Sequence, residues 1–240
     1  MKTSLLTGVS VSALLLAGGA QAADMPARPV YKAPAVAPAP WNWSGFYVGG
    51  TLGGIWSRNS IADGPPGPLG TYFGGGGSPS SLDNNGSGVI GGLELGYNWQ
   101  ISNVVLGVEA DLSATSVNRT LPFFADTFST KLPWLSTVRG RVGFAFDRFL
   151  VYGTGGAAFA NLSSTYVSAG FPFVVGPNST ATGWAAGGGV EYAVAGPWTV
   201  KAEYLHVGFS DRTAVSSSGG YNFTFKDSAD IGRVGINYKF

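Results

Sequence analysis

The chain has 240 residues, a formal net charge of +1 and only 11% charged residues, whereas an ordinary soluble domain has about 25%. The nearly neutral charge gives no electrostatic basis for binding nucleic acid, and the absence of cysteine excludes disulfides and thiolate chemistry. The chain is rich in glycine (38 residues) and in aromatic residues (13%). After the N-terminal segment it lacks an apolar run of the ~20 residues that a membrane helix needs, so the composition favours membrane strands.

Residues 1–22 have the layout of a secretory signal peptide. Lys2 precedes an apolar stretch over residues 5–17, and Ala20-Gln21-Ala22 has the small-x-small pattern of a cleavage site. The apolar stretch is too short to span a bilayer comfortably. We therefore expect cleavage between Ala22 and Ala23, with a short membrane anchor as the alternative.

Residues 23–42 are rich in alanine and proline and follow neither a helical nor a strand period. Because proline lacks a backbone N–H and fixes its own φ angle, such a segment favours an extended chain. We expect a periplasmic linker that acts as a flexible spacer. Contact with peptidoglycan, or filling of the barrel mouth, is the alternative role.

From residue 43 onward, apolar and polar side chains alternate with the period of two that is typical of a strand with one oily face. Each repeat is long enough for a tilted membrane strand, which needs ~9–11 residues. In the glycine-rich first and fifth repeats, the pattern does not indicate which residues face the lipid and which face the interior. The eight predicted strands are residues 45–56, 88–100, 104–114, 134–147, 149–160, 182–194, 198–209 and 229–240.

Short and long connections alternate between these strands, as in outer-membrane barrels. The tight turns are residues 101–103, 147–148 and 195–197, and the predicted long loops are residues 57–85, 115–133, 161–181 and 210–228. An even number of strands puts the N- and C-terminal ends of the barrel segment on one side of the membrane. The signal peptide then makes that side periplasmic and the long loops extracellular. Residues 43–240 are thus predicted to form an all-β, eight-stranded, antiparallel, up-and-down transmembrane β-barrel.

Charged residues occupy the face of the predicted strands opposite the apolar face. Because Arg or Lys facing the bilayer midplane costs ~2–4 kcal/mol, this face is expected to line the barrel interior. Side chains alone can fill the space inside eight strands, so we expect a charge ladder that plugs the bore. Inward glycines leave a narrow pore as the alternative. The predicted ladder is Glu94, Glu109, Asp111, Arg139, Arg141, Glu191, Lys201, Glu203, Arg233 and Lys239.

Aromatic residues gather where the predicted strands meet the short turns, the position of an interfacial girdle. This girdle is predicted to contain Trp99, Phe146, Phe149, Trp198, Tyr238 and Phe240. Tyr238 and Phe240 are also expected to act as a C-terminal assembly signal. A second girdle at the other interface has Trp56, Trp134, Trp184 and Phe209 as candidates.

The predicted long loops also carry aromatic residues. We expect them to pack on one another or to dip into the membrane, with an exposed binding surface as the alternative. They are Phe123, Phe124, Phe128, Phe171, Phe173, Tyr221, Phe223 and Phe225.

Two motifs that suggest chemistry have simpler structural explanations. Residues 153–158 mimic the dinucleotide fingerprint G-x-G-x-x-A, but no acid follows at about the distance a true site needs, so we interpret them as a strand. The single histidine, His206, excludes a multi-histidine metal site. Ser210 lies ~13 Å away along a strand, too far to pair with it. We expect no catalytic, cofactor-binding or metal site.

Several segments together resemble a known family. They are Trp43-Ser44-Gly45-Phe46-Tyr47-Val48-Gly49-Gly50, Val138–Gly143, Tyr152–Gly156, Lys201-Ala202-Glu203-Tyr204 and the closing strand through Phe240. The combination, over about residues 45–240, is similar to the small outer-membrane immunogenic proteins of Gram-negative bacteria, which are porin-family proteins with an OmpA-like barrel. The resemblance implies a surface barrel with structural and antigenic roles and implies no substrate.

The leading functional hypothesis is a non-enzymatic outer-membrane barrel with roles in envelope integrity and as a surface antigen or adhesin. A narrow porin for small solutes is the second hypothesis, and a lipid-modifying barrel enzyme is the third. The expected partners are outer-membrane lipid, lipopolysaccharide and the barrel assembly machinery. Peptidoglycan and host surface ligands are further candidates.

Overall fold

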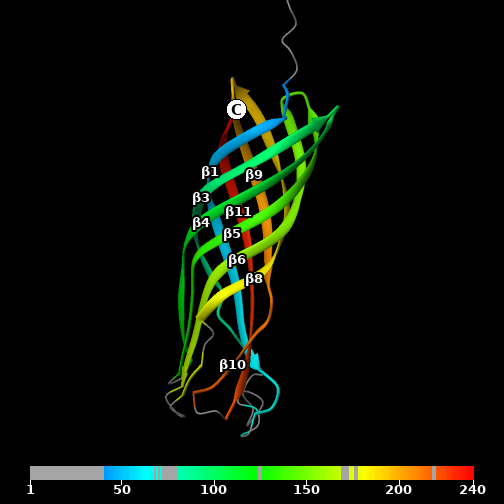
Figure 1. Cartoon of the computed structure of the whole chain (residues 1–240). Helices are drawn as coiled ribbons and strands as arrows, with labels where there is room; N and C mark the ends of the chain where they lie inside the picture. The colour runs from blue at the N-terminus through cyan, green and yellow to red at the C-terminus, as the bar shows by residue number, and fades with distance from the viewer. Residues whose placement is uncertain are drawn as a thin grey trace, which may run out of the picture. The chain divides into compact units, whose positions relative to one another are not determined.

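Eight long antiparallel strands close into a barrel in the computed structural model, in which no helix occurs among the described residues (Figure 1). The structure describes residues 41–67, 69, 71, 81–123, 126–168, 173–175, 178–217 and 220–240. The predicted signal peptide and nearly all of the predicted linker lie outside these residues. The long strands are β1 (Gly45–Asp63), β3 (Gly86–Ile101), β4 (Val104–Phe123), β5 (Asp126–Phe146), β6 (Phe149–Ser168), β8 (Asn178–Ala195), β9 (Trp198–Phe209) and β11 (Asn222–Lys239).

The first and last strands close the sheet. β1 pairs with β11 in one unbroken antiparallel register, from Tyr47 opposite Lys239 to Asp63 opposite Phe223. Every other long strand pairs with the neighbour that the up-and-down order gives it. The predicted fold is therefore confirmed.

The two ends of the barrel differ. At one end, which we call the turn end, lie the three tight turns, the start of β1 and the end of β11. The turns contain the left-handed residues Ser102 (φ 57°), Asp147 (φ 54°) and Gly196 (φ 50°), and such φ angles suit short hairpin connections. The opposite end, the loop end, carries the long connections and the short strands β2 (Ser81–Asp83), β7 (Phe173–Val175) and β10 (Arg212–Val215).

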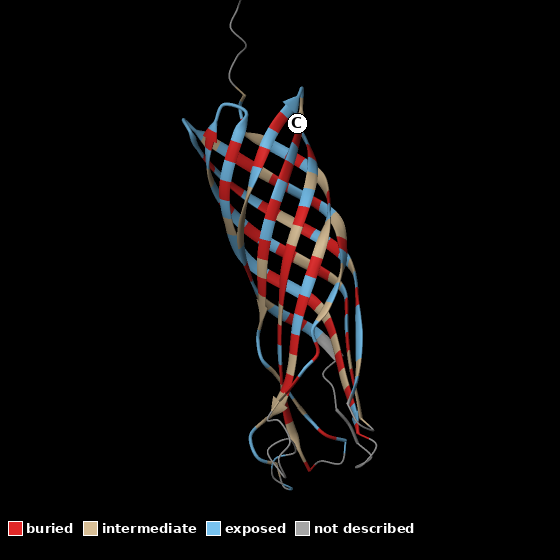
Figure 2. Cartoon of the chain, turned by 180° about the vertical axis from the view of Figure 1, so that it is seen from behind, coloured by how far each residue is buried: buried red, intermediate tan, exposed pale blue. Residues whose placement is uncertain are grey.

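Side chains alternate between a buried interior and an exposed exterior along every long strand, as the chequered colouring in Figure 2 shows. The alternation also gives the facing of the two glycine-rich strands. In β1, Leu52 is 61% exposed while Ile55 is fully buried; in β6, Val151 points out while Leu150 points in. Both strands thus have an oily outer face, which glycines had obscured in the sequence.

The strands continue well into the segments that the sequence predicted as long loops. Residues 57–63, 115–123, 126–133, 161–168, 178–181 and 222–228 all belong to strands. The backbone ladder continues because neighbouring strands are still side by side. The oily outward face is absent there, so the pattern by which the strands were recognised stops earlier than the strands themselves.

At the loop end the sheet separates into two lobes. Pairing between β3 and β4 stops at Ile90 opposite Thr115, whereas β4 and β5 stay paired to their hairpin at Phe123 and Asp126. One lobe is formed by the outer parts of β4, β5 and β6 with β7, and the other by those of β1 and β11 with β2 and β10. Figure 1 shows the two groups of strands diverging toward the loop end.

The two lobes are held together by an aromatic core. Ile61, Leu82, Phe223 and Phe225 from the β1–β11 lobe pack with Phe128 and Tyr166 from the β4–β6 lobe. The rings of Phe128 and Phe225 lie 6.3 Å apart, and the side chain of Asn84 donates a hydrogen bond across the lobes to the Phe128 carbonyl (3.2 Å). Among the predicted loop aromatics, Phe128, Phe223 and Phe225 are therefore buried rather than exposed. Phe124 and Phe171 lie outside the described residues, as do the side chains of Phe123 and Phe173.

Candidate functional site

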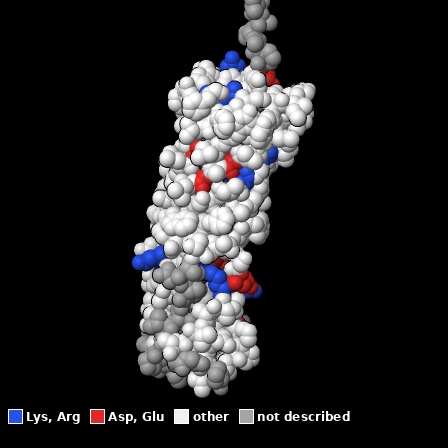
Figure 3. Space-filling view, viewed as in Figure 1, with Lys and Arg blue, Asp and Glu red and all other residues white. Residues whose placement is uncertain are grey.

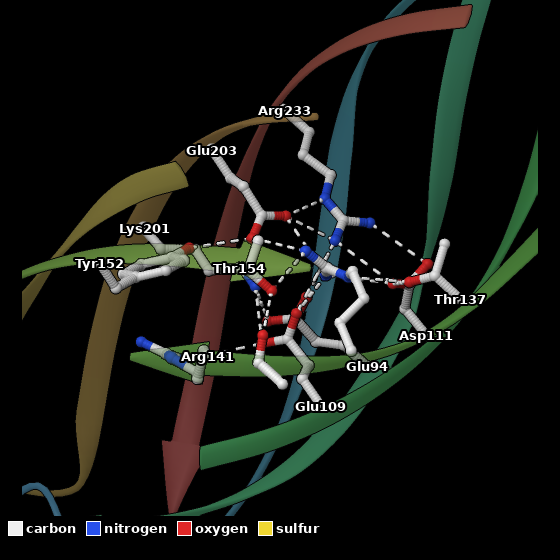
Figure 4. A network of polar contacts seen from close by, with 12 residues as sticks. Glu94, Glu109, Asp111, Thr137, Arg141, Tyr152, Thr154, Lys201, Glu203 and Arg233 are labelled. Carbon is white, nitrogen blue, oxygen red and sulfur yellow. Dashed lines mark hydrogen bonds and ion pairs between the residues drawn. The ribbon is translucent and has the colours of Figure 1, made fainter. Parts of the chain in front are cut away.

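Nine of the ten predicted ladder residues meet in the barrel interior, where each is between 1% and 5% exposed. We call this set the charge cluster, and Figure 4 labels all of its members except Arg139 and Glu191. It consists of Glu94 on β3, Glu109 and Asp111 on β4, Arg139 and Arg141 on β5, Glu191 on β8, Lys201 and Glu203 on β9, and Arg233 on β11.

The register of the sheet brings opposite charges side by side. Glu109 lies directly opposite Arg139, and Glu203 lies directly opposite Arg233. Glu191 pairs in the same way with Lys201. Because all of these residues share the inward face, the strand order that closes the barrel also assembles the cluster.

Arg139 connects the two walls of the barrel. Its guanidinium forms ion pairs with Glu109 and Asp111 on the neighbouring strand β4 and reaches Glu203 on β9, at 3.1 Å. Arg233 lies 2.6 Å from an oxygen of Glu203 on the neighbouring strand β9. The fork of five N–H donors in each guanidinium suits such multiple contacts. The ion pair between Arg139 and Glu203 crosses the barrel interior at this level.

The remaining cations complete the network. Lys201 Nζ lies 2.6 Å from Glu94 and 3.1 Å from Glu109. Arg141 lies 2.7 Å from Glu191, and its guanidinium stacks 4.0 Å from the centre of the Tyr152 ring. At Gly189 a Cβ atom would lie only 2.8 Å from the Tyr152 hydroxyl, so an inward glycine makes room for this ring.

Lys239 is a correction to the predicted ladder. It lies at the turn end, where its ammonium nitrogen is 5.4 Å from the ring of Trp41, and the ion pairs among the described residues do not include it. At the last position of β11 the bore opens toward water, so this charge needs no buried partner. The cluster therefore has five carboxylates and four cations. The neutral donors Tyr47, Tyr152 and Thr199 add hydrogen bonds to its carboxylates.

Apolar layers enclose the charge cluster on both sides, which the sequence reasoning missed. Toward the loop end the interior is filled by a layer that includes Ile55, Ile90, Leu135, Leu205 and Ile231. Toward the turn end, Trp43, Val105, Leu150, Ala193 and their neighbours form a second layer. Among the described residues, the interior thus contains one charged layer and three apolar layers, of which the third is the aromatic core between the lobes. The sequence signal for these layers was the presence of apolar residues at strand positions that face inward.

The six aromatics of the predicted turn-side girdle all lie on the outer surface at the turn end, between 36% and 74% exposed. Trp198 and Tyr238 pack edge to face, with 5.1 Å between ring centres. Toward the loop end, Trp56 and Trp184 are each 53% exposed. Phe209 is a correction, because it shares the inward side of β9 with Leu205 and Val207 and packs against the inner apolar layer.

His206 lies on the outer surface in a polar group that the sequence did not reveal. Its Nδ1 is 2.8 Å from an Asp230 oxygen, which also accepts a hydrogen bond from the Tyr204 hydroxyl (2.6 Å). The other Asp230 oxygen lies 2.6 Å from Arg58. The partner of His206 is thus Asp230 rather than Ser210. Figure 3 shows charged side chains gathered in separate patches on a largely uncharged face, one of them near the loop end.

Residues 153–158 are part of strand β6, where Gly153 pairs with Gly188 and Gly155 with Ala186. Within the described residues, no group of three or more metal-binding side chains is found. No helix in the described part of the chain is long and apolar enough to cross a membrane.

A closed eight-stranded sheet with an apolar exterior, interfacial aromatics and a side-chain-filled interior defines a transmembrane β-barrel. A family model described as the outer membrane protein beta-barrel domain matches residues 10–240. The chain belongs to this family and is an outer-membrane protein.

Its relatives carry names that agree with this assignment. The 31 kDa outer-membrane immunogenic protein of Brucella melitensis is 33% identical over 254 residues, which cover both chains completely. The 22 kDa outer membrane protein of Rhizobium leguminosarum bv. viciae is 30% identical over 199 residues, 83% of this chain and 79% of that protein. Among solved structures, the outer membrane protease OmpT from Escherichia coli has a TM-score of 0.51 at 8% identity, covering 83% of this chain and 98% of OmpT. That likeness concerns the fold alone.

We expect the charge cluster to be important for stability, because removing one partner of a buried ion pair leaves the others without compensation. Arg139→Ala should lower the free energy of unfolding by about 3–5 kcal/mol, measured as a shift of the urea midpoint for protein folded into lipid vesicles. Lys239→Ala, which removes a cation outside the cluster, is the matched control and should leave the midpoint nearly unchanged. Equal midpoints for Arg139→Ala and the unmodified protein would contradict the assigned role.

Proposed function

We propose that the protein is a non-enzymatic, non-conducting outer-membrane barrel that contributes to envelope integrity and presents its loop end as a surface antigen or adhesion surface. The observation that carries the proposal is the set of buried side chains that occupies the barrel interior. A layer of salt-bridged charges lies between apolar layers, and the aromatic core between the lobes closes the loop end. An ion entering this bore would have to break buried pairs and then cross apolar surface, at high cost.

In this proposal the turn end, where β1 begins and β11 ends, faces the periplasm, and the two lobes project outside the cell. The predicted signal peptide supports this orientation, as does the usual arrangement of short periplasmic turns and longer outer loops. The immunogenic relatives support a surface role, since an antigen must be reached from outside. Lipopolysaccharide, the barrel assembly machinery, peptidoglycan and host surface ligands remain proposed partners.

The two alternatives differ in what they require of the structure. A narrow porin needs a continuous water path, and its support is the large number of inward glycines. A lipid-modifying enzyme needs a nucleophile beside a base. His206 and Asp230 form a hydrogen-bonded pair on the outer surface. The neighbouring hydroxyl, that of Tyr204, donates its hydrogen bond to Asp230 and not to the histidine, so it is not placed as a nucleophile beside a base. We favour the closed, non-enzymatic barrel.

Conductance in planar bilayers separates the closed barrel from the porin. We expect the purified protein to give no stable open steps, with a general diffusion porin as the positive control. The double variant Arg139→Ala, Glu203→Ala should also stay closed, because the apolar layers remain. Stable steps from the unmodified protein would overturn the proposal, and steps from the double variant alone would show that the charges are the single barrier.

Orientation can be tested with introduced cysteines, because the chain has none of its own. Asp211→Cys places a thiol on the exposed loop end, and Arg148→Cys places one at an exposed turn. In intact cells a membrane-impermeant maleimide should label the Asp211→Cys protein, and the Arg148→Cys protein only after the outer membrane is permeabilised. The reverse labelling would contradict the proposed orientation.

A further inference from the structure

A polar groove opens on the outer surface where β3 leaves β4 and the two lobes begin to separate. It has a volume of about 580 Å³, within the range of small-molecule sites. The residues that matter for its chemistry are Trp56 and Arg58 from β1, Asn85 and Ser87 near the start of β3, and Asn118 and Arg119 from β4.

The lining of this groove is basic and polar. None of the described residues that line it is acidic, and each of its polar side chains can donate hydrogen bonds. Within the described part of the chain, Arg119 has no acidic partner. Two guanidiniums flanked by amides and hydroxyls match the oxygens of a phosphate group.

Arg58 is held in place from outside the groove. Asp230, which does not line the groove, lies 2.6 Å from its guanidinium, and Tyr204 and His206 in turn hydrogen-bond to Asp230. The Arg58 side chain nevertheless remains 64% exposed. Its remaining donors are therefore accessible to a ligand, while Asp230 restricts the freedom of the side chain.

The groove lies beside the apolar surface at its border with the polar loop end. Leu52 and Trp56, exposed by 61% and 53%, share the outward face of β1 with Arg58. Arg58 follows Trp56 by two residues, ~7 Å along a strand. A tryptophan at the interface with cationic residues just beyond it is the arrangement expected at the level of lipid headgroups.

We propose that this groove binds the phosphorylated sugar headgroup of an outer-leaflet glycolipid. Arg58 and Arg119 bind the phosphate, Asn85, Ser87 and Asn118 bind sugar hydroxyls, and Trp56 packs against the sugar or the adjoining acyl chain. The inference rests on the proposed orientation, which puts the groove in the outer leaflet.

The test is isothermal titration of the folded protein in detergent micelles with diphosphorylated lipid A. Two further titrations use the same lipid without phosphates and inorganic phosphate alone. We expect the phosphorylated lipid to bind, the dephosphorylated lipid to bind at least tenfold more weakly, and inorganic phosphate to bind much more weakly still. Equal binding of both lipids, or equally tight binding of inorganic phosphate, would overturn the headgroup assignment.

A charge-matched pair of double variants separates a specific site from general attraction. Arg58→Gln, Arg119→Gln should weaken binding of the phosphorylated lipid at least tenfold. The control Lys226→Gln, Arg148→Gln removes the same charge elsewhere, and the Lys226 side chain has the same 64% exposure as that of Arg58. This control should stay within about twofold of the unmodified protein. Equal losses in both double variants would overturn the site.

A second variant keeps the test independent of folding. Asn118→Asp changes one exposed side chain and adds a negative charge to the groove, so it should also weaken binding of the phosphorylated lipid. Unchanged binding in this variant would count against the site. Binding in micelles depends neither on cellular orientation nor on conductance, so a failure of the inference and a failure of the proposed function give different results.

Discussion

The structure depends on the requirement that a buried guanidinium be matched by carboxylates. Arg139 is 1% exposed and cannot be neutralised by losing its proton, so acids must surround it from both walls of the barrel. Its partner Glu109 lies on the neighbouring strand β4, whereas its partner Glu203 lies on β9, which is not a neighbour of β5. A one-residue slip in any of these strands would turn its charged face toward lipid. The charge cluster thus specifies the register of the barrel, even though buried ion pairs are weak evidence for net stability.

The apolar layers explain how such a cluster can exist inside a membrane protein. Ile55, Ile231 and their neighbours separate the charges from the loop end, while Trp43 and Leu150 separate them from the turn end. Excluding water strengthens every ion pair in the cluster. In the proposed closed barrel, the same layers would also block the passage of ions. The two lobes add a closed aromatic core and leave the outer surface as the place for contacts with lipid or with other molecules.

Much of the fold could be predicted because lipid imposes a strict alternation. Because Leu93 and Leu95 must face lipid and Glu94 must face the interior, only one orientation of β3 is possible. The turn lengths then give the order of the strands. The extensions beyond the membrane could not be predicted, because outward residues such as Arg58 and Ser60 have no lipid to face, and the oily pattern stops there. Lys239 lies on the same side of its strand as the ladder residue Arg233, but it is placed at the end of β11, where the bore meets water. The contact between His206 and Asp230 joins residues from different strands and depends on a register that the sequence alone does not fix.

The accessibility of the bore to small reagents tests the central claim most directly. Thr137 is fully buried beside Asp111 and Arg139 in the charge cluster, and Thr137→Cys would place a single thiol there with little change in volume. The rate of its reaction with a small charged thiosulfonate reagent can be measured in the folded and the urea-unfolded protein. The account predicts no measurable reaction until the barrel unfolds. Reaction in the folded barrel at a rate near that of an exposed thiol would show that the bore is open.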